Sequence, residues 1–109
     1  MPLDKQRLQG ILTELRRQLN TLYGDRLVKM ILYGSQARGD ARQWSDIDVL
    51  VVLRGPVRAS QEVRRSGGIV SGMCLEFDVD IQCLFVSEDQ YERSEGPVLQ
   101  DAHREGVEV

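Results

Sequence analysis

The spacing of apolar residues predicts a helix near the start of the chain. Six apolar side chains recur there at intervals that follow helical periodicity: Leu8, Ile11, Leu12, Leu15, Leu19 and Leu22. On a helix they form one apolar stripe, with charged residues mostly on the other side. Gly24 and Asp25 follow, and a glycine commonly ends a helix. We therefore predict an amphipathic helix that ends at Gly24.

Three later segments have the patterns of strands. Leu27–Tyr33 is almost continuously apolar, which suits a strand covered on both faces. Ser45–Leu53 is rich in Val and Ile, which favour strands. In Leu75–Val86 apolar and polar residues alternate, as they do along a strand with one buried face.

Helical patterns lie between and after these strands. From about residue 57 to residue 74, Val63, Val70 and Cys74 fall at helical spacing, with two glycines between them that weaken a helix. Ser87 is a candidate N-cap for a helix over 87–94, and a further helix is expected after Pro97. This order of helices and strands is typical of the α/β (α+β) class.

Length and composition indicate one small folded domain. The chain has 109 residues, of which 41% are hydrophobic, enough to form a core in a single domain over residues 1–109. No apolar run approaches the ~20 residues that cross a bilayer, and the start MPLDKQ lacks the apolar stretch of a signal peptide. Cys74 and Cys83 are too few for a disulfide scaffold and are expected in the core. We expect a cytoplasmic protein.

Charge is distributed unevenly along the chain. The 14 Lys and Arg residues against 17 Asp and Glu residues give a net charge of −3. Residues 1–70 hold 12 of the basic and 7 of the acidic side chains, so residues 71–109 are strongly acidic. Either these are solvated faces, or the basic part handles an anionic ligand while the acidic part holds cations. The acidic balance argues against a dedicated nucleic-acid binder.

The segment after the first predicted strand has the features of a phosphate-binding turn. Gly34 and Ser35 are expected to open a short helix through Arg38. Glycine lets a phosphate approach the backbone closely, and the Ser35 hydroxyl is a donor. Arg38 adds a planar, permanently charged group for phosphate oxygens. Alone, a Gly-Ser turn is a weak signal.

Paired carboxylates follow at two places. Asp46 and Asp48 are two residues apart, so on a strand they point the same way, and Asp78 and Asp80 repeat this spacing on the third predicted strand. Like charges on one sheet face repel unless a cation or proton offsets them. The pattern predicts either solvated edge strands or an Mg²⁺ site. A phosphate-binding turn at a fixed distance before Asp46 favours the Mg²⁺ site.

These residues resemble a known signature. Gly34-Ser35, ten further residues and Asp46-Ile47-Asp48 are similar to the GS-x10-DxD signature of the DNA polymerase beta-like nucleotidyltransferase superfamily. The string LYGSQARGDARQWSDIDVLVVL resembles its minimal nucleotidyltransferase (MNT) subgroup, whose pattern is close to GSxARG…SDIDLLV. The resemblance covers essentially the whole chain. It implies the polymerase beta-like fold, with a small mixed sheet of three or more strands flanked by helices.

The resemblance also implies how substrate and metal would be held. Gly34 and Ser35 would hold the β- and γ-phosphates of ATP or another nucleoside triphosphate. Asp46 and Asp48 would bind two Mg²⁺ ions.

A third carboxylate would complete one metal site and help to activate the attacking hydroxyl. Asp80 is preferred because it lies deeper in the predicted strand, but Asp78 remains open.

The implied activity is transfer of a nucleoside monophosphate, AMP from ATP, to a hydroxyl acceptor with release of pyrophosphate. MNT proteins commonly pair with an all-helical HEPN-type protein and act as the antitoxin of a toxin–antitoxin pair. The expected partner is therefore a HEPN-type protein, or a second copy of the chain. The alternative is a non-catalytic nucleotide- or partner-binding module that neutralises a HEPN protein by complex formation. A polymerase-like enzyme is disfavoured, because this length leaves no room for a single-strand channel.

Two further residues stand out in the sequence. Trp44 precedes the Asp46–Asp48 pair and is expected to pack the loop rather than to stack on a base, although the MNT pattern more often has a small or polar residue there. His103 is the only histidine and is expected at the surface.

Overall fold

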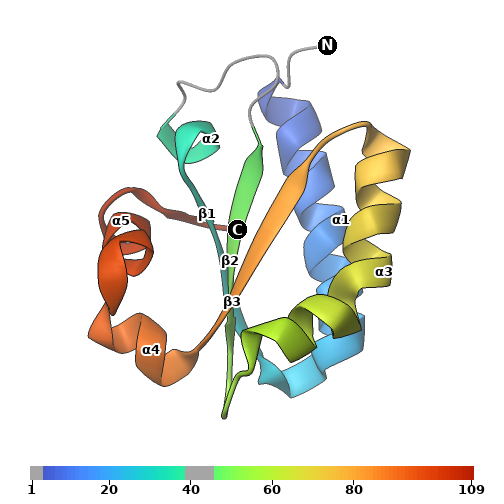
Figure 1. Ribbon diagram of the computed structural model, residues 1–109. Helices are drawn as coiled ribbons and strands as arrows, with labels where there is room; N and C mark the ends of the chain where they lie inside the picture. Colours follow the sequence, from blue (N-terminus) through green and yellow to red (C-terminus); the bar gives the residue numbers. More distant parts are fainter. Residues whose placement is uncertain (1–3, 39–45) are drawn as a thin grey trace.

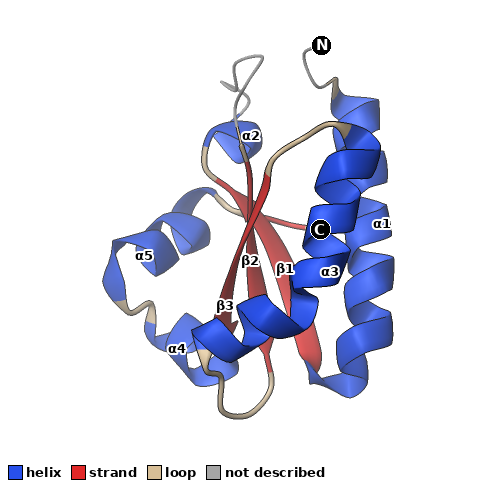
Figure 2. Ribbon diagram, turned by 45° about the vertical axis from the view of Figure 1, so that its right-hand side comes forward, coloured by secondary structure: helices blue, strands red, loops and turns tan. Residues whose placement is uncertain are grey.

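The structure is a computed structural model that describes residues 4–38 and 46–109. In those residues a four-stranded mixed sheet, in the order β3-β2-β1-β4, lies between two helical layers (Figure 1). The long helices α1 (Lys5–Tyr23) and α3 (Ala59–Phe77) cover one face, and α4 (Glu88–Arg93) and α5 (Gly96–Glu105) lie against the other (Figure 2). The predicted class, α/β (α+β) with a small mixed sheet flanked by helices, is confirmed.

Helix α1 ends where the sequence predicts. The Asp4 carboxylate accepts a hydrogen bond of 2.7 Å from the backbone N–H of Arg7 and caps the start of the helix. Gly24 ends it with a φ of +56°, and a 3-10 turn, η1 (Gly24–Arg26), follows. The predicted stripe faces the sheet, and its central residues are buried: Ile11, Leu12, Leu15 and Leu19.

The strands pair in both directions. β1 (Leu27–Tyr33) is antiparallel to β2 (Ile47–Leu53), and β2 is parallel to β3 (Ile81–Ser87). A parallel pair needs a crossover connection, which α3 provides. The sequence did not predict β4 (Val107–Glu108), which pairs antiparallel with β1, because two residues are too few to show a period.

The central strand β2 is buried on both faces. Ile47, Val49 and Val51 pack toward α1 and α3, while Leu50 and Val52 pack toward α4 and α5, and all five are inaccessible to solvent. Burial on both sides explains the continuous run of Val, Ile and Leu in this segment. No helix in the described residues is long and apolar enough to cross a membrane.

The prediction of a strand over Leu75–Val86 is wrong for the first half of that segment. Helix α3 continues to Phe77, and β3 begins only at Ile81. Leu75 was expected on a buried strand face, but it lies in the last turn of α3 and is 84% exposed.

Asp78 ends helix α3. It takes a left-handed conformation with a φ of +53°, which Asp tolerates better than most residues. The backbone N–H groups of Asp78 and Val79 both donate to the carbonyl oxygen of Cys74. A short alternation of polar and apolar residues fits either a strand or an exposed helix end. In this segment the capping hydrogen bonds to Cys74 favour the helix.

Of the three apolar residues that predicted α3, Val70 and Cys74 pack against the hydrophobic core, but Val63 does not. Val63 is 53% exposed, whereas Glu62 and Ser66 are at most 2% exposed. The Ser66 hydroxyl donates to the Glu62 backbone carbonyl at 2.8 Å. Glu62 contacts Tyr23 of α1, and no pattern of apolar residues could predict this buried polar contact.

The buried Glu62 carboxylate is stabilised by three neighbours. The Tyr23 hydroxyl donates to its Oε1 atom at 2.8 Å, and Arg26 and Arg65 place guanidinium nitrogens 3.7 Å and 3.6 Å from its oxygens. Burial, together with the Glu62 side chain, raises the pKa of Tyr23 well above its usual range. A buried charge is tolerated only with such partners, so this cluster links α3 to α1 and η1.

Helices α4 and α5 confirm the two helices predicted after Ser87 and Pro97. The Ser87 hydroxyl accepts from the Gln90 N–H at 3.1 Å, and the Gln90 side chain accepts from the Ser87 N–H at 2.9 Å. This reciprocal pair is a capping box. Leu99 and Ala102 of α5 are buried against the second face of the sheet.

We expect Glu62→Ala to lower the free energy of unfolding by about 2–3 kcal/mol, because it leaves the buried Tyr23 hydroxyl and the neighbouring cations without their acceptor. Urea unfolding followed by circular dichroism measures this change. Glu14→Ala is the control, because it breaks the exposed Glu14–Arg17 pair of 2.6 Å and should cost much less. Equal losses for the two variants would contradict a structural role for the buried cluster.

Candidate active site

The turn after β1 has the predicted local structure. Gly34 has a φ of +74°, and Ser35–Arg38 form the short helix α2, in which the Arg38 N–H donates to the Gly34 carbonyl at 3.1 Å. A Cβ atom at Gly34 would lie 2.8 Å from the Oδ2 atom of Asp48. Two features of this position therefore require glycine: the positive φ of the backbone and the close approach of the Asp48 carboxylate.

Asp46, Asp48 and Asp80 meet at one end of the sheet. Asp46 immediately precedes β2, Asp48 is its second residue, and Asp80 immediately precedes β3. Ile47 is paired with Ile81 across the two strands, and the Ile47 N–H donates to the Asp80 carbonyl at 2.8 Å. Asp46 and Asp80 thus occupy equivalent positions, each directly before one of two adjacent parallel strands.

The carboxyl groups of this cluster influence one another electrostatically. Burial, the charge of Asp80 and a hydrogen bond with the Asp80 side chain raise the pKa of Asp46. Burial and the charges of Asp46 and Asp80 raise the pKa of Asp48. Mutual repulsion makes the ionised cluster unfavourable, and a bound cation would relieve it.

The structure separates Asp78 from this cluster. The expectation that Asp78 and Asp80 share one face of a strand is wrong, because neither lies within β3 and Asp78 is the left-handed cap of α3. Asp80, and not Asp78, is among the groups that raise the pKa of Asp46 and Asp48. Of the two alternatives left open by the sequence, the geometry favours Asp80 as the third carboxylate.

Arg38 lies at the end of α2 and contacts helix α5. Its Nη1 atom donates to Oε2 of Glu105 at 3.0 Å. Hydrogen bonds from Arg38 and Arg104 lower the pKa of Glu105. The predicted phosphate-binding arginine is therefore oriented in part by a carboxylate from the acidic C-terminal segment.

The sequence did not indicate three residues near the site as functional candidates. Gln82 donates from Nε2 to Asp80 Oδ1 at 3.2 Å, and Tyr33 pairs with Asp48 across β1 and β2. Burial and the Asp48 charge raise the pKa of Tyr33. Glu105 is the third. The strand register could have suggested Gln82 and Tyr33, but no local pattern signals a contact between residues 38 and 105.

The donor chemistry suits a hard cation, although the cluster is not a complete metal site. Among residues 4–38 and 46–109, no three His, Cys, Asp or Glu side chains lie close enough together to hold a metal ion. Charge repulsion acts over longer distances than the ~2.0–2.1 Å of Mg²⁺ coordination, which explains why the three carboxylates interact without forming a metal cage. Mg²⁺ is usually bound by one or two carboxylates together with substrate phosphates and waters, and this cluster can meet that need.

The remaining sequence expectations concern residues outside the cluster. Cys83 and Cys74 pack against the hydrophobic core as predicted, and burial, with a smaller contribution from Cys74, raises the pKa of Cys83 to about 12. His103 is exposed as predicted, and its ring stacks on Tyr91 with centroids 4.1 Å apart. Trp44 lies outside the described residues.

Comparison with known proteins identifies the family. Residues 12–104 match the nucleotidyltransferase domain family. Two relatives come from Methanocaldococcus jannaschii. Putative protein adenylyltransferase MJ1305 is 32% identical over 85 residues, which cover 77% of this chain and 58% of that protein. Putative protein adenylyltransferase MJ0604 is 32% identical over 80 residues, which cover 73% of this chain and 74% of that protein.

Solved structures share the fold at lower sequence identity. A toxin–antitoxin crystal structure with AMP-PNP aligns with a TM-score of 0.62 and 20% identity, covering 92% of this chain and 70% of the other. A crystal structure of a mutant MntA–HpeT toxin–antitoxin aligns with a TM-score of 0.58 and 17% identity, covering 97% and 72%.

The chain thus belongs to the nucleotidyltransferase domain family, as the signature residues indicated. It spans just over half the length of MJ1305.

We expect Gly34→Ala to destabilise the protein by about 1–2 kcal/mol or more, because alanine is strained at positive φ and its methyl group would displace Asp48. Thermal and urea unfolding measure the loss. Gly10→Ala in α1 is the matched control, since nothing lies within 4 Å of its Cβ position and helix propensity should make it stabilising by about 0.5–1 kcal/mol. A neutral Gly34→Ala would contradict the close approach.

We expect Asp48→Asn to stabilise the metal-free protein near neutral pH. The pKa of Asp48 is raised in the folded state, so the folded protein binds more protons than the unfolded chain, and stability falls as pH rises from the unfolded value through the folded pKa. Asparagine removes this loss. Unfolding in EDTA from pH 4 to pH 7 measures it.

Asp78→Asn is the control for this titration, because asparagine also tolerates the left-handed conformation and residue 78 lies outside the cluster. It should leave the pH dependence unchanged. The same stabilisation in both variants would show that the carboxylate cluster is not its source.

Proposed function

We propose that this chain transfers a nucleoside monophosphate, AMP from ATP, to a hydroxyl group of a partner protein in an Mg²⁺-dependent reaction. The observation that carries the proposal is the approach of Gly34 to Asp48 within the cluster of Asp46, Asp48 and Asp80. A turn suited to phosphate thus lies beside oxygen ligands suited to Mg²⁺. Family membership and relatives named as protein adenylyltransferases support the same reaction.

In this proposal the turn after β1 binds the triphosphate. Gly34 has no side chain to block a phosphate, and Ser35 offers its hydroxyl as a donor. Arg38 would bind phosphate oxygens through its guanidinium. Because Glu105 accepts a hydrogen bond from Arg38, the triphosphate would compete with that carboxylate for the same cation.

The three carboxylates would act with the nucleotide to hold metal. When bound, two Mg²⁺ ions would lower the pKa of the acceptor hydroxyl and offset the charge of the leaving pyrophosphate. Asp46 and Asp48 would provide ligands for both ions, and Asp80 would complete one site. Since the cluster alone does not enclose a metal, we expect Mg²⁺ to bind tightly only together with the nucleotide.

The proposed chemistry needs positioning rather than a covalent enzyme intermediate. The acceptor oxygen forms a bond to the α-phosphorus as the bond from the α-phosphorus to the oxygen bridging the β-phosphorus breaks. Pyrophosphate leaves, and the acceptor proton passes to the carboxylate cluster, with Asp80 as the expected recipient. Orientation and charge neutralisation supply the rate in such transfers.

We further propose that the acceptor is a HEPN-type helical toxin and that this chain, acting as one domain, is its antitoxin. Two structural neighbours are toxin–antitoxin structures, one of them with AMP-PNP. The cysteines Cys74 and Cys83 are free, which is consistent with the reducing, ATP-containing cytoplasm.

A second candidate function is neutralisation of the partner by binding alone. The observation that favours it is the lack of a preassembled metal site among the described residues. The two functions differ in whether the carboxylates are needed for the effect on the partner, so substitution of the carboxylates distinguishes them.

We expect Asp46→Asn, Asp48→Asn and Asp80→Asn each to lower transfer by at least about 10²-fold, because each removes a charged oxygen needed at the reacting phosphate. The measurement is incorporation of label from α-labelled ATP into a co-purified partner protein, with Mg²⁺ or with EDTA. EDTA should abolish transfer by the unsubstituted protein.

Asp78→Asn is again the matched control and should retain nearly full transfer. Loss of activity in Asp78→Asn with retention in Asp80→Asn would reverse the assignment of the third carboxylate. Tight binding of the partner with no label in any variant would support the non-catalytic function instead.

A further inference from the structure

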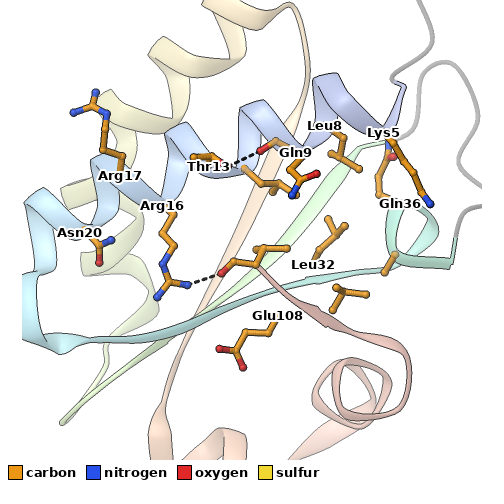
Figure 3. Close-up of a pocket in the computed structure, with 14 residues that line it drawn as sticks. Lys5, Leu8, Gln9, Thr13, Arg16, Arg17, Asn20, Leu32, Gln36 and Glu108 are labelled. Atoms are coloured by element: carbon orange, nitrogen blue, oxygen red, sulfur yellow. Dashed lines mark hydrogen bonds between the residues drawn. The ribbon is translucent and has the colours of Figure 1, made fainter.

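A groove lies beside α1, and none of the three clustered carboxylates lines it. It has a volume of about 860 Å³ and runs between α1 and the β4 edge of the sheet (Figure 3). Leu8, Leu12 and Leu32 line its apolar part, and Val107 of β4 borders it. Gln36 and Ala37 of α2 also line it, and Gln36 lies close to Lys5 (Figure 3).

The groove exists because the helical layer is narrower than the sheet. α3 and α1 lie side by side on this face, and α1 packs on β1, but β4 extends the sheet by one strand beyond it. Val107 is consequently 49% exposed. A helix placed beside α1 over β4 would complete the layer and cover Val107.

Two cations at the rim of the groove, Lys5 and Arg16, are not paired with an Asp or Glu side chain of the described residues, whereas Arg17 is paired with Glu14. Arg16 donates from Nη1 to the backbone carbonyl of Val109 at 2.5 Å. The one acidic lining residue, Glu108, lies 4.0 Å from the Lys29 ammonium. A partner surface with carboxylates at the rim would therefore be favoured over a basic one.

We propose that this groove binds an amphipathic helix of a partner protein, with an apolar stripe on the groove floor and two acidic residues at Lys5 and Arg16. Lys5 and Arg16 are 11 residues apart on α1, about 16 Å along the helix axis, or three turns. A partner helix that lies along α1 would meet both cations with acids at the same spacing of 11 residues. Helix-in-groove binding uses this combination of apolar anchors and charged edges.

The location of the groove connects such a partner to the nucleotide site. Gln36 and Ala37 lie between Ser35 and Arg38, so a bound helix would contact the same short helix that is proposed to hold the triphosphate. The proposal rests on the proposed function for the existence of a partner protein. Binding of the helix to the groove does not depend on the proposed transfer reaction, because the groove residues are separate from Asp46, Asp48 and Asp80.

The test uses a helical probe peptide of about 18 residues, long enough to be stable as a helix when bound, with leucines on one face and two glutamates 11 residues apart at its edge. A second peptide carries lysines in place of the glutamates. Fluorescence anisotropy without nucleotide or Mg²⁺ measures binding, and circular dichroism measures helix formation. We expect saturable binding of the acidic peptide, with a gain of helicity, and weaker binding of the basic peptide.

Charge reversal in the protein makes the test specific. In Lys5→Glu/Arg16→Glu, affinity for the acidic peptide should fall by about three- to tenfold or more, the scale of two exposed ion pairs, and the basic peptide should become the preferred ligand. Arg64→Glu, on the exposed surface of α3, makes the same kind of charge change outside the groove and should have no effect. Asp48→Asn should bind both peptides as the unsubstituted protein does, which separates this test from the transfer reaction.

Several outcomes would overturn the proposal. They are equal binding of the two peptides, no saturable binding by the folded protein, and binding without a gain of helicity. Self-association that Lys5→Glu/Arg16→Glu abolishes, measured by analytical ultracentrifugation, would also overturn it, since the groove would then hold a second copy of the chain.

Discussion

The parallel pairing of β2 with β3 is the constraint on which the candidate site depends. Ile47 lies opposite Ile81, and this register sets Asp46 beside Asp80 at the start of the two strands. The pairing also requires the crossover helix α3, which with α1 covers one face of the sheet. A shift of one residue would turn the β2 side chains to the opposite face and bury the carboxylates against α1 and α3. The fully buried residues of β2 strongly disfavour such a shift.

The site concentrates features that oppose folding, and the core beside it offsets them. Gly34 has a left-handed backbone, and the Asp48 carboxylate approaches it so closely that no side chain fits. Burial and the neighbouring carboxylates raise the pKa of Asp46 and of Asp48, so ionising these two groups is unfavourable. Such local costs are typical of functional sites, where geometry is retained for ligand binding rather than for stability. Here they lie at the end of a strand whose apolar residues are inaccessible to solvent.

Helix α2 lies between the C-terminal helix α5 and the groove beside α1. Arg38 contacts Glu105 of α5 on one side, and Gln36 and Ala37 line the groove beside α1 on the other. The turn proposed to bind phosphate thus contacts the acidic C-terminal segment through Arg38 and borders the groove beside α1.

The sequence by itself determined the family, the amphipathic helix α1, the extents of β1 and α2, and the candidate residues Gly34, Ser35, Arg38, Asp46 and Asp48. These features depend on local periodicity, on turn chemistry and on a motif of contiguous residues, all of which are encoded within short segments. Only the tertiary structure decided that Asp80 and not Asp78 lies near Asp46 and Asp48. The end of α3 depends on the capping hydrogen bonds at Asp78, and the pattern of apolar residues does not reveal them. The tertiary structure likewise decided that α3 buries Glu62, that Glu105 contacts Arg38, and that β4 leaves a groove beside α1. Each of these joins residues far apart in the chain, and such contacts arise from packing and register rather than from local sequence.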